Sequence, residues 1–150
     1  MNTQPFVDPF VTGRPGEAAR QAAARILAGP HLSILSTTNP DGSPQASVIF
    51  VKPDGADLLF STIGGRRKTL NMRRDPRVSL LVHGLPGGEA NTYATVSGDV
   101  TITADPDGAF HQVMYDLYMG GATPPPEPGA ERLIVRLRPR RSYAPPVYVA

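Results

Sequence analysis

The residues of this chain best suited to chemistry lie together between positions 61 and 71. Ser61 and Thr62 supply two hydroxyls ahead of a pair of glycines. Three cations, Arg66, Arg67 and Lys68, then open a predicted helix. The N-terminus of a helix already carries partial positive charge, so cations there are unfavourable unless an anion lies among them. Backbone N–H groups, hydroxyl donors and Arg or Lys side chains are what a phosphate needs, so the segment predicts a phosphate site.

Two other interpretations of this basic cluster compete with a phosphate site. A solvated helix start would only aid solubility, and the helix dipole argues against it. A nucleic-acid surface usually interleaves its cations with aromatic residues, and residues 61–82 contain none, so we expect no nucleic-acid partner. Three further arginines, Arg73, Arg74 and Arg77, either form a solvated face or extend the positive field towards a long anionic tail.

Elsewhere the sequence shows no arrangement typical of nucleophilic, metal or paired-carboxylate catalysis. The chain has no cysteine, and its three histidines are far apart without metal-ligand spacing, so we expect them to be structural and predict no metal site. Asp41 and Asp54 belong to predicted turns. Tyr115 and Tyr118 either line a substrate pocket or pack their rings with exposed hydroxyls. The catalytic residues are left unassigned.

Length and composition indicate one domain with a sizeable core. The chain has 150 residues, 40% of them hydrophobic, and a net charge of only +2. A domain of this size buries roughly 70% of the surface that its unfolded chain would expose. We find no secretory signal pattern and no apolar run near ~18 residues, so we expect a cytoplasmic protein with no membrane partner.

Hydrophobic periodicity and turn signals predict a mainly β fold with short helices at 66–74 and after Asp105-Pro106. An alanine-rich helix is also expected at 16–28. Gly98 interrupts the alternation of one strand, which suggests a bulge in a curved sheet. Six strands in mostly antiparallel order favour a small closed barrel. The strands are expected at 31–38, 45–52, 57–62, 77–83, 92–103 and 132–138. The expected divisions are an extended arm at 1–14, the barrel domain at 15–139 and an extended tail at 140–150.

The segment from residue 35 to residue 82 resembles a known family. An Asn-Pro-Asp-Gly hairpin at 39–42, a strand ending at Ser61 and Thr62, and the Arg-Lys-Thr-Leu-Asn run at 67–71 follow one another at its spacing. The chain resembles the pyridoxamine-phosphate-oxidase-like split barrels, and more closely the branch that uses the deazaflavin coenzyme F420, over roughly residues 25–140. The resemblance implies a six-stranded antiparallel split β-barrel, a homodimer, and a cofactor groove at the dimer interface.

By position, the resemblance also implies which residues hold the cofactor. The second strand would run along the cofactor ring, and the two hydroxyls would contact its ribityl chain and phosphate. The three cations would bind the phosphate, and a polar residue follows on the same helix. The implied cofactor residues are Gln45, Ser47, Val48, Ser61, Thr62, Arg66, Arg67, Lys68 and Asn71.

The implied function is an oxidoreductase that transfers a hydride between reduced coenzyme F420 and a small conjugated organic substrate. Such a cofactor performs the redox chemistry itself, which agrees with the lack of an evident acid–base pair. One alternative is an FMN-dependent enzyme of the pyridoxamine-phosphate-oxidase type, for which we find no second phosphate site. Another is a non-catalytic flavin or tetrapyrrole carrier or sensor. The loop at 84–91 lacks the aromatic residue expected near the ring, so no substrate is inferred.

Overall fold

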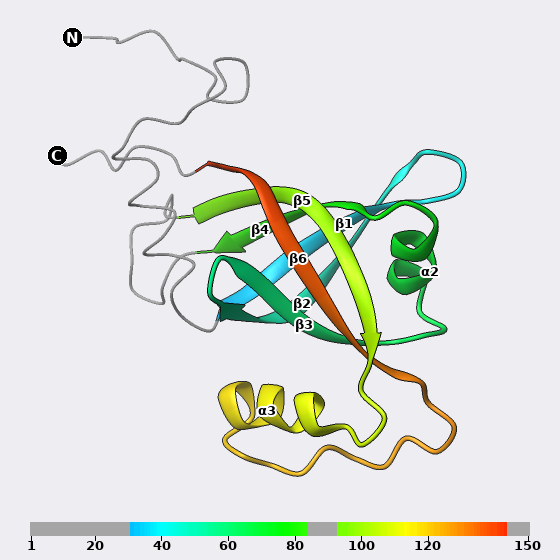
Figure 1. Cartoon of the computed structure of the whole chain (residues 1–150), viewed down its shortest axis with the longest axis vertical. Helices are drawn as coiled ribbons and strands as arrows, with labels where there is room; N and C mark the ends of the chain where they lie inside the picture. Colours follow the sequence, from blue (N-terminus) through cyan, green and yellow to red (C-terminus); the bar gives the residue numbers. More distant parts are fainter. Residues whose placement is uncertain (1–30, 84–92, 144–150) are drawn as a thin grey trace, which may run out of the picture.

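The computed structural model describes residues 31–83 and 93–143, which form a six-stranded barrel with two short helices (Figure 1). Each expected strand is present, and all ends but one lie within two residues of the prediction. The expected arm at 1–14, the helix at 16–28 and the loop at 84–91 fall outside the described residues. The elements are β1 (His31–Thr38), β2 (Pro44–Asp54), β3 (Asp57–Ile63), α2 (Arg67–Arg74), β4 (Arg77–His83), β5 (Tyr93–Ala104), α3 (Ala109–Tyr118) and β6 (Arg132–Tyr143).

The strands close into an antiparallel barrel in the order β1-β2-β3-β6-β5-β4, which confirms the predicted fold class. Because successive side chains of a strand point to opposite faces, every second residue turns inward. These inward residues make one continuous core, and Met72 of α2 reaches into it. The most buried of them include Leu35, Phe60, Leu80, Val96, Val135 and Leu137.

The turn between β1 and β2 has the predicted chemistry. The Gly42 N–H donates to the Asn39 carbonyl at 2.9 Å, and Gly42 has a φ of +84°, which only glycine adopts readily. The Asp41 carboxylate accepts hydrogen bonds from the hydroxyl and N–H of Ser43, and these bonds lower the pKa of Asp41. Asp41 is therefore a turn residue, as its sequence context predicted.

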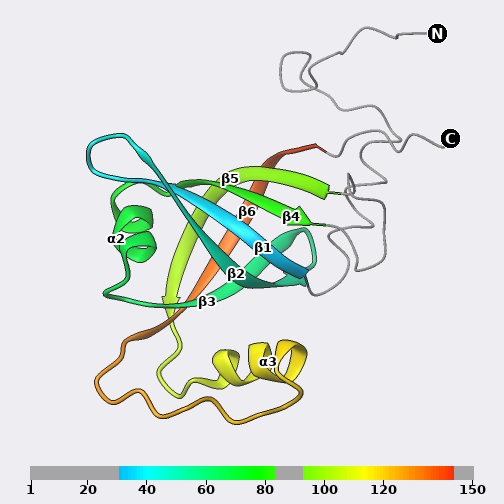
Figure 2. The same cartoon turned by 180° about the vertical axis from the view of Figure 1, so that it is seen from behind.

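The barrel is split between β2 and β3. β2 pairs with β1 over eight residue pairs but with β3 over only three, from Lys52 to Asp54. Beyond this short ladder β3 turns away from β2. Along its other edge, β3 pairs with β6 over six residue pairs. Figure 2 shows β2 and β3 diverging from their shared hairpin. Before Lys52, the edge of β2 that faces β3 thus pairs with no other described strand, as expected for a split barrel.

One tyrosine of α3 satisfies part of this open edge. The Tyr118 hydroxyl accepts a hydrogen bond from the Val51 N–H at 3.1 Å and donates one to the carbonyl of the same residue. Both groups of one residue point to the same side of an extended strand, so a single hydroxyl serves both. The Tyr118 ring stacks on Phe50 with centroids 4.4 Å apart and planes 10° from parallel. Tyr118 therefore fixes α3 over the split.

The start of α3 is held by Asp105, which is buried at 4% exposure. Its carboxylate accepts hydrogen bonds from the N–H groups of Phe110 at 3.2 Å and His111 at 3.0 Å. A carboxylate at a helix N-terminus also opposes the positive end of the helix dipole. Asp105 therefore satisfies two N–H groups in the first turn of α3, whose N-cap residue is Gly108. In the described ranges, no helix is long and apolar enough to cross a membrane.

The last strand is longer than predicted. We expected it to end at residue 138, because Pro139 cannot donate to a sheet, but β6 continues to Tyr143. The β5–β6 register shifts at this level: Gly98 pairs with Pro139 and Ser97 with Arg141, so β6 carries one extra residue, Arg140, and continues past Pro139. A Cβ on Gly98 would lie 2.0 Å from the Arg138 carbonyl oxygen, so the bulge requires glycine. The predicted bulge is confirmed, and the predicted tail at 140–150 is wrong as far as residue 143.

We expect Tyr118→Phe to lower the free energy of unfolding by about 1–3 kcal/mol, because it leaves a backbone N–H and a carbonyl of Val51 unsatisfied. The ring stack on Phe50 is retained in this variant. The control is Tyr115→Phe, which removes a hydroxyl that has no hydrogen-bond partner among the described residues. Urea unfolding of both variants measures the difference, and equal losses would contradict the assigned role of Tyr118.

Candidate functional site

A cavity of about 210 Å³ lies in the split of the barrel. Its walls come from β2, β3, β6 and the two helices, which meet there because β3 leaves β2. Five of the predicted cofactor residues line it, and four do not. The lining residues are Val48, Ile49 and Phe50 of β2, Ser61 and Thr62 of β3, Arg66 and Lys68 at the start of α2, His111, Met114 and Tyr115 of α3, and Arg132 of β6.

The N-terminus of α2 opens beside this cavity without a side-chain cap. Arg66 is the N-cap residue with an extended backbone, and the first turn contains no acidic residue. No ion pair within the described ranges joins Arg66, Arg67 or Lys68 to a carboxylate. The helix dipole and the cations therefore add up to an uncompensated positive charge, which is the electrostatic requirement of an anion site.

Lys68 is half-buried in this charged wall. Burial lowers the pKa of Lys68 below its ordinary value of 10.5, and the positive charges of Arg66 and Arg132 lower it further. Both effects disfavour the charged ammonium. An anion bound next to Lys68 would act in the opposite direction, so binding and protonation of this residue are linked.

The hydroxyl of Thr62 is committed to the protein. Thr69 donates its only hydroxyl proton to the Ile63 carbonyl at 2.7 Å, and the Thr62 and Thr69 oxygens lie 2.9 Å apart. Since the Thr69 proton is already used, Thr62 must be the donor in that pair. Thr62 is only 2% exposed. It therefore lines the cavity without offering a proton to it, and it helps to fix the start of α2.

Ser61 has a different partner, which the sequence had not indicated. The Arg132 Nη1 donates to Ser61 Oγ at 3.3 Å. The other edge of the guanidinium binds Glu127, from Nε at 2.7 Å and from Nη2 at 2.6 Å. Arg132 lies diagonally across the β3–β6 ladder from Ser61, which pairs with Ile134. The alternating pattern of β6 was the one available signal, since it places Arg132 on the same face as Ile134.

The residue before Arg132 supports the glycines of the same loop. The Gly64 N–H donates to the Glu131 carbonyl at 3.0 Å, and the Glu131 side chain pairs with Arg73 at 3.0 Å. A Cβ on Gly64 would lie 2.1 Å from a Glu131 carboxylate oxygen, whereas one on Gly65 would meet no atom within 4 Å. Gly64 thus allows the start of β6 to pack against the loop, and Gly65 leaves space above it.

α3 forms the wall opposite the strands. His111 and Tyr115 both line the cavity, and their rings meet edge to face with centroids 4.9 Å apart. Burial lowers the pKa of His111 below its ordinary 6.5, and Arg132 lowers it further against the opposing effects of Glu127 and Asp105. We expected His111 to be structural, but the structure places it at the cavity, where its lowered pKa favours the neutral imidazole. Tyr115 lies on the wall, whereas Tyr118 does not.

Asn71 and Gln45, two of the predicted cofactor residues, belong to a buried network away from the cavity. Asn71 is fully buried, and its amide donates to Thr37 Oγ1 and to Asn39 Oδ1, both at 3.0 Å. Thr37 in turn donates to Gln45 Oε1 at 2.9 Å. This network ties α2 to the β1–β2 hairpin.

The remaining two predicted cofactor residues also lie outside the cavity lining. Ser47 Oγ is buried and has no hydrogen-bond partner among the described residues. Arg67, the first residue of α2, is exposed and does not line the cavity, although its sequence neighbours Arg66 and Lys68 do.

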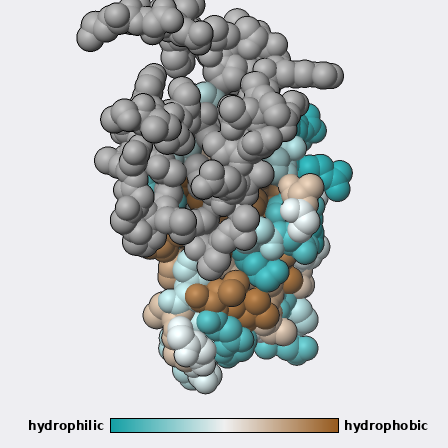
Figure 3. Space-filling model, turned by 90° about the vertical axis from the view of Figure 1, so that its left-hand side faces the viewer, coloured by the Kyte–Doolittle hydropathy of each residue, from teal (hydrophilic) through white to brown (hydrophobic). Residues whose placement is uncertain are grey.

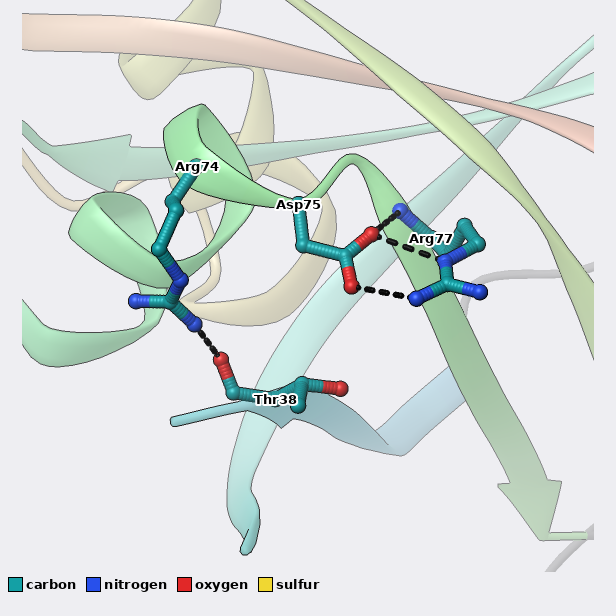
Figure 4. Close-up of polar contacts among 4 residues, drawn as sticks. All are labelled: Thr38, Arg74, Asp75 and Arg77. Atoms are coloured by element: carbon teal, nitrogen blue, oxygen red, sulfur yellow. Dashed lines mark hydrogen bonds and ion pairs between the residues drawn. The ribbon is translucent and has the colours of Figure 1, made fainter. Parts of the chain in front are cut away.

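The three further arginines are bound to acceptors of the protein itself, and Figure 4 shows two of them, Arg74 and Arg77. Arg77 Nε and Nη2 donate to the Asp75 carboxylate at 2.9 and 2.8 Å, bonds that lower the pKa of Asp75 to about 2. Arg74 points away from this pair and donates to the Thr38 carbonyl. Arg73 pairs with Glu131. None of the three is thus an unengaged cation for a long anionic tail.

A second, more open hollow of about 460 Å³ lies between α2, β5 and β6. Its floor is apolar, with Met72, Val100 and Leu133, and its cation Arg73 is neutralised by Glu131. Although larger, this hollow presents no unpaired charge from the described residues. The smaller cavity is therefore the better candidate for ligand chemistry.

Comparisons with known proteins agree with this geometry. The sequence profile of the family described as pyridoxamine 5'-phosphate oxidase matches residues 19–144. The pyridoxine/pyridoxamine 5'-phosphate oxidase of Rubrobacter xylanophilus is 30% identical over 99 residues, which cover 65% of this chain and 44% of that protein. The chain thus spans less than half the length of this curated relative.

Solved structures show the same fold. A structure named F420 reductase superposes with a TM-score of 0.72 and 34% identity, covering 79% of this chain and 94% of that one. A heme binding protein from Mycobacterium smegmatis superposes with a TM-score of 0.63 and 19% identity, covering 86% of this chain and 53% of that one. At the latter identity the likeness shows the fold alone.

We expect the affinity for a phosphate-bearing ligand to fall as the pH rises through the lowered pKa of Lys68, because only the ammonium form attracts the anion. The loss should begin below the ordinary lysine value of 10.5. Lys68→Arg should remove this step, because arginine keeps its charge across the range. Titrations with inorganic phosphate from pH 7 to pH 10 measure both profiles, and identical profiles would contradict the role of Lys68.

Proposed function

Since the chain belongs to the pyridoxamine 5'-phosphate oxidase family, we propose that it is an oxidoreductase that binds coenzyme F420 in the split between β2 and β3. It transfers a hydride between the reduced cofactor and a small conjugated organic substrate. When bound, such a cofactor supplies the hydride chemistry, and the chain binds it, orients it and excludes water from it.

One observation carries this proposal: among the described residues no carboxylate pairs with Arg66 or Lys68, and both line the cavity at a helix N-terminus without a side-chain cap. Elsewhere in the described ranges, the cations Arg73, Arg77, Arg132 and Arg136 all pair with carboxylates. Unpaired charge confined to a cavity wall is costly unless a ligand compensates it. A phosphate or phosphodiester group is the ligand that fits this donor set.

The wall beyond the cations suits a flat ring. β2 presents Val48, which is 66% exposed, and Phe50 to the cavity. The large exposure of Val48 shows that this wall has no cover in the single chain. The volume of about 210 Å³ is also below the roughly 300–1,000 Å³ of typical cofactor pockets. A ring laid against β2 would therefore need a further surface on its other side.

F420 is favoured over FMN by the likeness to the F420 reductase structure, which at 34% identity extends over 94% of that chain. Within the site, Arg67 supports the same choice. It is exposed, it adjoins two cavity residues, and no described carboxylate pairs with it. A cofactor whose anionic tail continues past the phosphate would reach Arg67, whereas FMN ends at the phosphate.

FMN is the second candidate, and a specific observation favours it. Arg73, Arg74 and Arg77 were the surplus cations that suggested a long tail, and all three are engaged by protein acceptors. The two cations of α2 that line the cavity, Arg66 and Lys68, balance the double negative charge of a phosphate monoester. The match to the Rubrobacter oxidase agrees with this candidate.

We further propose that the chain acts as a homodimer whose second copy covers the exposed apolar wall. Leu32, Ile34 and Val48 are 54%, 45% and 66% exposed on the outer face of β1 and β2. Leu117 and Met119, at 43% and 48%, extend this apolar surface at the end of α3. Figure 3 shows hydrophobic surface on the side of the molecule where α3 lies. Apolar groups gathered in this way are typical of a protein interface.

We expect Arg66→Ala and Lys68→Ala each to weaken cofactor binding by roughly 10- to 100-fold, since a hydrogen bond to a charged group contributes about 1.5–3 kcal/mol. The control is Arg77→Ala, which removes the same charge from a residue paired with Asp75, and it should change the Kd less than about threefold. Fluorescence titrations with F420 and with FMN measure these values. Tighter binding of FMN than of F420 would make FMN the cofactor.

Failure of both cofactors to bind below about millimolar would overturn the proposal. A protein that binds one of them is then incubated with its reduced form and a panel of conjugated acceptors. Consumption of reduced cofactor, followed by its absorbance, identifies an enzyme. Its absence across the panel would leave the carrier alternative as the better account.

We expect the protein to sediment at about twice its chain mass of 16.0 kDa, and Ile34→Asp to shift it towards the monomer and weaken cofactor binding. A buried charge at an apolar interface is costly, which is the physical reason. Leu70→Asp is the matched control, because Leu70 is equally exposed at 45% but lies on α2. Analytical ultracentrifugation decides the matter, and a wild-type monomer would contradict the dimer.

A further inference from the structure

Arg132 divides its guanidinium between two partners. The edge formed by Nε and Nη2 binds Glu127 at 2.7 and 2.6 Å, and the remaining Nη1 donates to Ser61 Oγ at 3.3 Å. The Arg132 side chain is 16% exposed and that of Glu127 is 29% exposed, so the pair is largely shielded from water. A two-point bond between guanidinium and carboxylate fixes the plane of the guanidinium, and therefore also the direction of Nη1.

The loop between α3 and β6 supplies Glu127 for this purpose. Figure 1 shows this loop running below the barrel from α3 to the start of β6. It closes with a hydrogen bond from the Ala130 N–H to the Glu127 carbonyl at 3.0 Å, next to Gly129 with a φ of +75°. Glu127 precedes Arg132 by five residues, and the turn brings its carboxylate to the guanidinium edge formed by Nε and Nη2. Glu127 thus binds the edge of the Arg132 guanidinium that does not contact Ser61.

A serine hydroxyl has one proton to donate and two lone pairs to accept with. When Arg132 occupies a lone pair of Ser61 Oγ, the proton is directed to another side of the oxygen. Ser61 and Arg132 both line the cavity, and the other polar side chains that line it are Thr62, Arg66, Lys68, His111 and Tyr115. The neighbouring Thr62, in contrast, has no hydroxyl proton to offer to the cavity, because it donates that proton to Thr69.

We propose that Arg132 is a positioning residue: held by Glu127, it fixes Ser61 as a hydrogen-bond donor to the anion in the cavity. This inference rests on the proposed function, in that an anionic cofactor group occupies the site. Since Glu127 neutralises Arg132, the pair contributes direction and not net charge. The attraction itself comes from Arg66 and Lys68. Ser61 adds a neutral donor whose strength depends on Arg132.

A double-mutant cycle on cofactor affinity tests this assignment. One arm is Ser61→Ala in the otherwise unchanged protein, expected to raise the Kd about tenfold. The other arm is Ser61→Ala in a background that carries both Glu127→Gln and Arg132→Met. This background removes one positive and one negative charge together, so the net charge of the site is unchanged. In it, Ser61→Ala should raise the Kd less than twofold, because the hydroxyl is no longer oriented.

A tenfold effect of Ser61→Ala in both backgrounds would overturn the inference, because Ser61 would then act without Arg132. The same holds if Ser61→Ala has no effect in either. Thermal melting shows whether the charge-neutral background is folded. Arg132→Lys serves if it is not, since one ammonium keeps the ion pair with Glu127 but lacks the second arm that reaches Ser61. Wild-type protein that binds neither cofactor would refute the proposed function instead, so the two failures are distinguishable.

Discussion

The rest of this structure depends on the early separation of β3 from β2. The two strands part after three residue pairs, whereas β3 pairs with β6 along its other edge over six residue pairs. The separation opens the cavity, and it leaves an unpaired strand edge that α3 must cover. It also directs the end of β3 to the start of α2, where Arg66 and Lys68 meet the cavity. The β3–β6 ladder thus helps to close the barrel, and the short β2–β3 ladder leaves space for a ligand.

Charge is distributed in this barrel with a clear division of roles. Most arginines of the described ranges are tied to carboxylates or carbonyls and hold elements together, as Arg73 holds α2 to the start of β6. The cations at the start of α2 break the ordinary rule for helix N-termini, and no carboxylate of residues 31–83 or 93–143 pairs with them. Local rules broken without internal compensation are typical of functional sites. In the free protein, the positive end of the helix dipole repels these cations and destabilises the fold. The same positive potential attracts an anion to the site.

The sequence was sufficient for the existence and order of the strands, for the turn at 39–42 and for the cluster of cations at the start of α2, because each depends on residues close together in the chain. Arg132 escaped prediction because its partner Ser61 lies 71 residues away, and only the β3–β6 register brings them together. Asn71 was assigned to the cofactor because a polar residue on a basic helix looks the same whether it faces a ligand or a buried network. The length of β6 was missed because the register shift that lets the strand continue past Pro139 depends on its pairing with Ser97 and Gly98, about 40 residues away in the sequence.

The bond between Tyr118 and Val51 has a consequence for the motions of this protein. The Val51 N–H faces an edge where no strand protects it, and its partner is a side chain of a separate helix. Its exchange with solvent deuterium therefore requires only that α3 lift, whereas amides in the β4–β5 ladder exchange when strands part. The ratio of these exchange rates reports how often the helix leaves the split while the barrel stays closed. Exchange at this one amide thus measures access to the cavity without any ligand.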